Sequence, residues 1–148
     1  MDSLPTFAKI LVAVDGSDHA EKAFRHAMAL AQKFGSKVVI ANVTLPPVSG
    51  GGMGHFQISE TVKATIDSSE YLVKKFSSIA KQEFGITAES VTAKGGAIAD
   101  EILKATESSK ADLIVIGSSG LTGFKEMVLG SVSNAMVHRA KVPVLTVK

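Results

Sequence analysis

The strongest constraint on the fold of this chain is a regular alternation between short apolar runs and longer amphipathic stretches. Apolar runs rich in β-branched residues recur from residues 9–15 near the start to 142–147 at the end. Such runs, without a polar face, are typical of strands covered by helices on both sides. The stretches between them carry apolar residues at helical spacing. Strands that alternate with helices predict a single parallel α/β sheet.

The expected elements follow from this pattern and from the turn residues between the runs. We expect strands at residues 9–15, 37–43, 86–93, 112–116 and 142–147, and helices at about 18–34, 59–84, 97–108 and 130–139. Ser17 or Asp18 is expected to cap the first helix and Gly35 to end it. The segment 44–58 contains two prolines and several glycines and is expected to be a flexible loop that acts as a lid or mobile segment. No Lys-Ser/Thr follows its glycines, so it does not match a Walker phosphate loop.

Length and composition limit the class of protein. A chain of 148 residues fits one domain, spanning residues 1–148. The net charge of +2, with acids and bases interspersed, gives no basis for nucleic-acid binding. Cysteine is absent, which excludes disulfides and thiol catalysis. No apolar run is long enough to span a bilayer and no signal peptide is evident, so we expect a cytoplasmic protein without a membrane partner.

A glycine-rich stretch after the fourth expected strand carries the clearest functional pattern. Gly117, Gly120 and Gly130 lie in a strand-to-helix connection, where parallel sheets bind ligands. Residues without a Cβ let the backbone approach a ligand, and helix N-termini attract anions. The hydroxyls of Ser131 and Ser133 are potential further donors to phosphate oxygens. These residue types indicate a phosphate site, although glycines that only form turns are the alternative.

The spacing Gly-x2-Gly-x9-Gly-Ser resembles the nucleotide-binding signature of the ATP-binding branch of the universal stress protein family. The resemblance extends over the whole chain. It implies a Rossmann-like, open five-stranded parallel sheet in the order 3-2-1-4-5, with helices on both faces. It also implies a stress-response regulator that binds ATP, or AMP or ADP, with Mg²⁺ or Mn²⁺ held through the phosphates. The implied assembly is a homodimer through the final strand, from Val142 to Val147; the downstream protein partner is unknown.

The resemblance assigns further residues to an adenine-nucleotide site. Asp15 would face the nucleotide or its metal, although a turn or cap role fits the same position. The backbone of Val43 would pair with the adenine edge. Ala13, Val14 and Ile116 would line the base, although each is equally a core residue. With the glycine-rich stretch, the expected nucleotide-binding set is Ala13, Val14, Asp15, Val43, Ile116, Gly117, Gly120, Gly130, Ser131, Val132 and Ser133.

Several polar residues near these positions favour other interpretations. Ser118 and Ser119 are either ligands or solvated loop residues, and Lys125 is expected on the surface. Family motifs often carry a basic residue or His just after the first glycine, where this chain has serine. His19 and His26 lie on one helical face without a third metal ligand, so we expect solvated side chains and no protein-held metal.

Two other functions stay open at this point. A slow metal-dependent ATPase or phosphotransferase would need a base and a cation near the γ-phosphate, and no arginine lies near the motif. A nucleotide-free interaction module is the third possibility, and the intact glycines argue against it. No catalytic residue is assigned.

Overall fold

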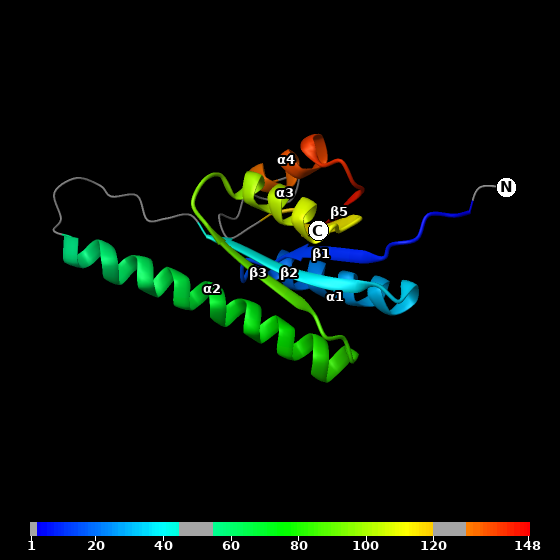
Figure 1. Ribbon diagram of the computed structural model, residues 1–148, viewed down its shortest axis with the longest axis horizontal. Coiled ribbons are helices and arrows are strands. Elements are labelled where there is room, and N and C mark those ends of the chain that lie inside the picture. Colours follow the sequence, from blue (N-terminus) through cyan, green and yellow to red (C-terminus); the bar gives the residue numbers. More distant parts are fainter. Residues whose placement is uncertain (1–2, 45–54, 120–129) are drawn as a thin grey trace.

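The computed structural model describes residues 3–44, 55–119 and 130–148 (Figure 1). Strands and helices alternate along it, as the sequence predicts. The elements are β1 (Lys9–Ala13), α1 (Asp18–Phe34), β2 (Lys37–Thr44), α2 (His55–Phe84), β3 (Glu89–Lys94), α3 (Ile98–Ser109), β4 (Leu113–Gly117), α4 (Ser131–Arg139) and β5 (Val144–Val147).

The strands form one parallel five-stranded sheet in the order β3-β2-β1-β4-β5, which confirms the predicted fold. β1 is the central strand, and its Val12 pairs with Ile40 of β2 on one side and Val115 of β4 on the other. The chain leaves β1 toward β2 and later returns to β4, so the strand order reverses between β1 and β4. In parallel α/β sheets ligands bind at the carboxyl ends of such strands.

Helices cover both faces of the sheet and create two apolar cores (Figure 1). α1 and α2 pack on one face, where Phe24 and Phe76 lie with their ring centroids 4.8 Å apart. α3 and α4 pack on the other face, around Ile102, Ile114 and Met136. Strand residues alternate between the two cores, with Ile10 and Val12 on the first and Leu11 on the second. This explains why the strands are apolar throughout.

The predicted caps of α1 are confirmed, and several element boundaries differ from the prediction, including the end of β1 at Ala13. Ser17 caps α1 through its hydroxyl, which accepts the Ala20 amide at 3.2 Å, and Gly35 ends the helix with a left-handed backbone. α2 begins at His55, so the predicted loop 44–58 is too long at both ends: Thr44 belongs to β2 and residues 55–58 belong to α2. The glycine run stops at Gly54, and the next residues contain no helix breaker. Residues 45–54 lie outside the described part of the chain.

The last strand is shorter than expected. β5 begins at Val144, and Val142 and Pro143 precede it. Pro143 has no amide to donate to the ladder, although its carbonyl accepts from the Ile114 amide at 3.0 Å. β3 likewise begins at Glu89 rather than residue 86. No helix within the described ranges is long and apolar enough to cross a membrane.

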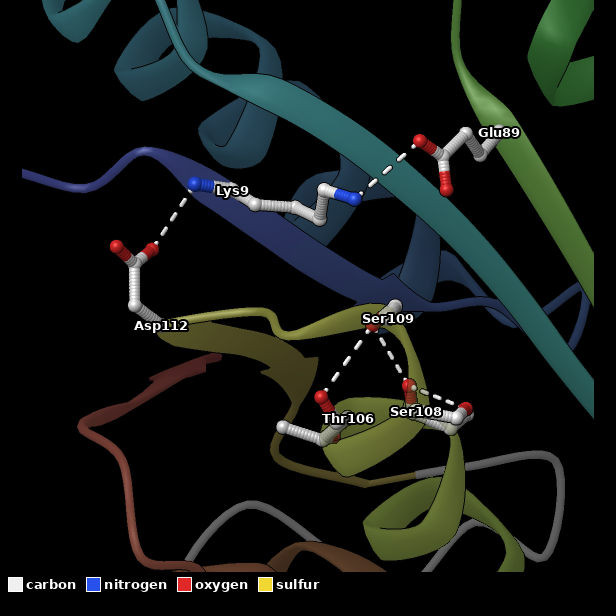
Figure 2. A network of polar contacts seen from close by, with 7 residues as sticks. Lys9, Glu89, Thr106, Ser108, Ser109 and Asp112 are labelled. Atoms are coloured by element: carbon white, nitrogen blue, oxygen red, sulfur yellow. Dashed lines mark hydrogen bonds and ion pairs between the residues drawn. The ribbon is translucent and has the colours of Figure 1, made fainter.

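Polar contacts join the amino ends of neighbouring segments of the sheet, at the edge opposite the predicted site (Figure 2). Asp112 precedes β4, and its two carboxylate oxygens accept the amides of Lys9 and Ala8 at 3.0 and 2.9 Å. The Lys9 ammonium lies 3.3 Å from the Glu89 carboxylate of β3 (Figure 2). Thr106, Ser108 and Ser109 direct their hydroxyls back to α3 carbonyls. The carboxylate and hydroxyls of this edge are therefore engaged in structural bonds.

We predict that Phe24→Ala lowers the free energy of unfolding by about 3–5 kcal/mol, because it opens a cavity between α1 and α2. Phe24 is 1% exposed and contacts both Phe76 and Phe84. Urea denaturation followed by circular dichroism measures the loss. Tyr71→Ala is the control, because this side chain on α2 is 67% exposed. Equal losses in the two variants would contradict the assignment of Phe24 to the core.

Candidate functional site

Ser118, the first residue after β4, joins three elements at the carboxyl edge of the sheet. Its amide donates to the Val147 carbonyl of β5 at 2.7 Å. Its carbonyl accepts the Gly130 amide at 2.6 Å and the Ser133 hydroxyl at 3.0 Å. These bonds hold the start of α4 beside the end of β4, although the thirteen residues 118–130 separate the two elements in the chain.

The N-terminus of α4 presents backbone donors at this edge. Gly130 is the N-cap residue and supplies no side-chain cap. The amides of Ser131, Val132 and Ser133 begin the helix and have no acceptor within residues 3–44, 55–119 and 130–148. Unpaired amides and the positive end of the helix dipole attract anions. The arrangement is suited to a phosphate group.

The two described glycines of the motif are required for different reasons. A Cβ on Gly117 would lie 2.8 Å from the His19 carbonyl carbon and 3.0 Å from the Ala20 amide nitrogen. Gly117 therefore has no side chain because the first turn of α1 packs against it. A Cβ on Gly130 would meet the Ser118 carbonyl at 3.3 Å and the Ser119 Cα at 3.4 Å. Gly120 lies outside the described residues.

The Ser133 hydroxyl contacts two backbone carbonyls at the start of α4. The side chain is 2% exposed, and its hydroxyl lies 3.0 Å from both the Ser118 and Gly130 carbonyls. One hydroxyl proton is thus committed to the backbone. In the structure without ligand this hydroxyl stabilises the start of α4, and its donation to a phosphate stays a prediction. The Ser131 side chain is exposed, and the amides of both residues face no competing acceptor.

Asp15 lies in the turn after β1 and takes the turn role that the sequence allowed. Its Oδ1 accepts the Ser17 amide at 2.9 Å, while Gly16 adopts a left-handed backbone with φ of 83°. Asp15 is half-buried, and its Oδ2 has no hydrogen-bond partner in the described part of the chain. One carboxylate oxygen is therefore available at the β1 side of the edge.

Asn42 is a residue of this region that the sequence analysis missed. Its side chain is 3% exposed, donates to the Val14 carbonyl at 2.6 Å and accepts the Ser69 hydroxyl of α2 at 2.6 Å. It thereby holds the end of β1, next to Asp15, against β2 and α2. A lone amide within the apolar run of 38–43 was the available signal, because a buried polar side chain needs partners.

The apolar residues expected around the base fall on both faces of the sheet. Ile116 belongs to the core beneath α3 and α4, and Ala13, Val43 and Val132 are half-buried against the same core. Val14 lies on the opposite face, among the buried residues under α1 and α2. The structure brings Ala13, Val43, Ile116 and Val132 to one side and separates the side chain of Val14 from them.

The histidines and serines near the site differ from expectation. His19 is half-buried rather than solvated, and its Nδ1 lies 2.8 Å from Ser119 Oγ and 3.1 Å from Ser118 Oγ. His26 is exposed, as predicted, with Nδ1 2.8 Å from the Lys22 carbonyl. The side chain of His55 and all of Lys125 lie outside the described residues. No group of three or more His, Asp or Glu side chains that could hold a metal occurs in the described part.

Comparison with known proteins decides the family. The model of the universal stress protein family matches residues 6–148. The chain belongs to this family. Over 145 residues it is 35% identical to a universal stress protein of Methanocaldococcus jannaschii, which covers 96% of this chain and 82% of that protein.

Solved members of the family share the fold. A universal stress protein of Lactobacillus plantarum is 21% identical, with a TM-score of 0.82 over 98% of this chain and 100% of that one, and supports the fold alone. A universal stress protein of Archaeoglobus fulgidus, solved in complex with dAMP, is 27% identical. Its TM-score is 0.65, over 97% of this chain and 100% of the other. The predicted family and fold are confirmed.

We predict that Gly117→Ala destabilises the protein by about 1–3 kcal/mol, because the new methyl group meets the backbone of α1. Gly130→Ala is the matched comparison, because its methyl group meets no atom closer than 3.3 Å and φ is −57°. Chemical denaturation of the two variants measures the difference. Equal stability of Gly117→Ala and wild type would show that α1 does not pack here as described.

Proposed function

We propose that this chain binds an adenine nucleotide, ATP foremost, at the carboxyl edge between β1 and β4, and acts as a nucleotide-dependent regulatory protein in the stress response. The observation that carries the proposal is the set of amides of Ser131, Val132 and Ser133, which begin α4 without an acceptor among the described residues. Phosphate oxygens are the natural partners of such donors. AMP and ADP present the same chemistry and are the alternative ligands.

The α4 dipole alone is too weak for the proposed affinity. It contributes about 0.3–2 kcal/mol, whereas micromolar binding requires about 8 kcal/mol. Further contacts therefore have to come from the base and sugar. Ala13, Val43 and Val132 are half-buried on the α3 and α4 side of the sheet, and they are apolar surfaces available to an adenine ring. The dAMP complex of the related Archaeoglobus fulgidus protein supports an adenine base as the partner.

The proposed nucleotide would carry a divalent cation, Mg²⁺ or Mn²⁺, on its phosphates. A carboxylate oxygen is the ligand type that Mg²⁺ prefers. Asp15 Oδ2, without a hydrogen-bond partner in the described residues, is a group at this edge that suits such an ion. The other carboxylate oxygen stays with the Ser17 amide and keeps the turn in place.

The residues at this edge favour nucleotide binding without rapid hydrolysis. Phosphoryl transfer relies on cationic groups to stabilise charge at the γ-phosphate. Residues 13–20, 117–119 and 130–134, the described segments after β1, after β4 and at the start of α4, include no lysine or arginine. We therefore propose a nucleotide sensor rather than an efficient ATPase.

We predict that Gly130→Val abolishes ATP binding measured by calorimetry in the presence of Mg²⁺. The branched side chain would occupy the space beside the Ser118 carbonyl and the start of α4. Gly130→Ala should show an intermediate loss, since its single methyl group meets the same atoms at 3.3–3.4 Å. Unfolding curves of both variants control for lost structure. Wild-type affinity in a folded Gly130→Val protein would refute the assigned site.

Nucleotide released by acid from the freshly purified protein identifies the natural ligand. Adenine nucleotide in the extract, together with calorimetric binding, supports the sensor. An extract without nucleotide and a wild type that binds none would instead favour an interaction module. Sustained hydrolysis near 1 s⁻¹, the lower range of kinases, would favour an enzyme.

We further propose a homodimer in the cytoplasm, formed through β5. This strand pairs with β4 on one side and has no strand partner on its other side in the described structure. Leu145 of β5 and Val137 of α4 are apolar and exposed, at 37% and 47%. Free strand edges with apolar residues favour pairing between copies.

Light scattering tests this assembly. Wild type is expected at twice the chain mass, and Leu145→Lys at the chain mass, because a charge at an unpaired apolar edge opposes strand pairing. Exposed Tyr71→Lys on α2 is the control and should keep the mass of wild type. A monomeric wild type at high concentration would contradict the dimer.

A further inference from the structure

His19, Ser118 and Ser119 form a polar group that joins α1 to the segment after β4; we name it the His19 cluster. His19 is the second residue of α1, and both serines follow β4, about a hundred residues later in the chain. Nδ1 of His19 lies 2.8 Å from Ser119 Oγ and 3.1 Å from Ser118 Oγ. Both hydroxyls therefore lie within hydrogen-bond distance of the same ring nitrogen, which has one N–H or one lone pair to share between them.

Ser118 connects this cluster to the proposed phosphate donors. Its hydroxyl contacts His19, its amide donates to Val147, and its carbonyl receives the Gly130 amide and the Ser133 hydroxyl. Every polar atom of Ser118 is therefore engaged, and the residue is buried. The position of the α4 N-terminus depends on the Ser118 carbonyl, and the orientation of Ser118 depends in part on His19.

The imidazole is not needed to dock α1 on the sheet. The backbone of His19 and Ala20 already packs against Gly117, and a Cβ on that glycine would lie within 3.0 Å of it. Buried Ala20, Ala23 and Phe24 extend the contact into the core. The side chain of His19 thus adds hydrogen bonds to the serines, while apolar and backbone contacts hold the helix.

We propose that His19 is a positioning residue for the nucleotide: its imidazole orients Ser118 and Ser119 so that the amides of Ser131, Val132 and Ser133 are held ready for the phosphates. This inference rests on the proposed function. Without the imidazole the buried Ser118 hydroxyl loses its partner, and an unpaired buried hydroxyl drives rearrangement. The Ser118 carbonyl and the attached start of α4 would then move away from the binding geometry.

The test compares three variants by calorimetry with MgATP and by melting without ligand. His19→Ala should bind about tenfold more weakly, the effect of losing about one to two neutral hydrogen bonds. His19→Asn should stay within about threefold of wild type, because an Asn side chain places a donor and an acceptor where Nδ1 stands. His26→Ala, in the same helix, should bind as wild type, because that side chain is exposed.

Without ligand, His19→Asn and His26→Ala are expected to melt within about 2 °C of wild type, and His19→Ala a few degrees lower, because the buried Ser118 hydroxyl loses its partner. If His19→Ala does not fold, Ser119→Ala removes the shorter contact from the other side and should weaken binding by several-fold. The inference is overturned if His19→Ala binds like wild type, or if His19→Asn is as weak as His19→Ala. In both cases ATP binding itself stands. A wild type that binds no nucleotide overturns the proposed function as well.

Discussion

The carbonyl oxygen of Ser118 is the acceptor on which the arrangement of the carboxyl edge depends. It accepts the Gly130 amide at 2.6 Å and the Ser133 hydroxyl at 3.0 Å. These two hydrogen bonds join the residue after β4 to the start of α4. α4 packs on the sheet through buried Met136, and the Ser118 carbonyl fixes the start of this nine-residue helix. The amides of its first turn lie beside the end of β4 because this acceptor holds Gly130 there.

Small and polar residues at this edge serve the fold first and the proposed ligand second. Gly117 makes room for α1, Ser133 braces the α4 start, and Asp15 closes a turn. Asn42 occupies a buried position and satisfies two partners. These contacts leave the helix amides, one Asp15 oxygen and a half-buried apolar surface unused. A site built in this way is preorganised. The groups proposed to contact the nucleotide are held in position by neighbouring residues that do not contact it.

Apolar and amphipathic patterns predicted the alternating strands and helices, and the family resemblance predicted the strand order; the structure confirms both. Apolar runs and caps are local features of the sequence, so they predict strands and helix ends directly. Ser17 and Gly35, at the two ends of α1, are examples. Errors arose where a residue had a distant partner. The sequence predicts a solvated His19 because no third metal ligand lies at useful spacing, yet the two serines that it contacts lie about a hundred residues away. The sequence leaves Ala13 and Val14 open as base-lining or core residues, and the structure places Val14 in the core under α1 and α2 and Ala13 against the other core.

The sequence by itself determined the α/β class, the family and the presence of a glycine-rich connection after a buried strand, because these follow from residue types and spacing along the chain. Only the tertiary structure decided what each residue of that connection does. Whether a hydroxyl is free for a ligand or committed to a carbonyl depends on which distant groups approach it, as at Ser133 and Ser118. Hydrogen bonds are directional and short-ranged, so their partners are set by how the strands and helices pack, not by their order in the chain.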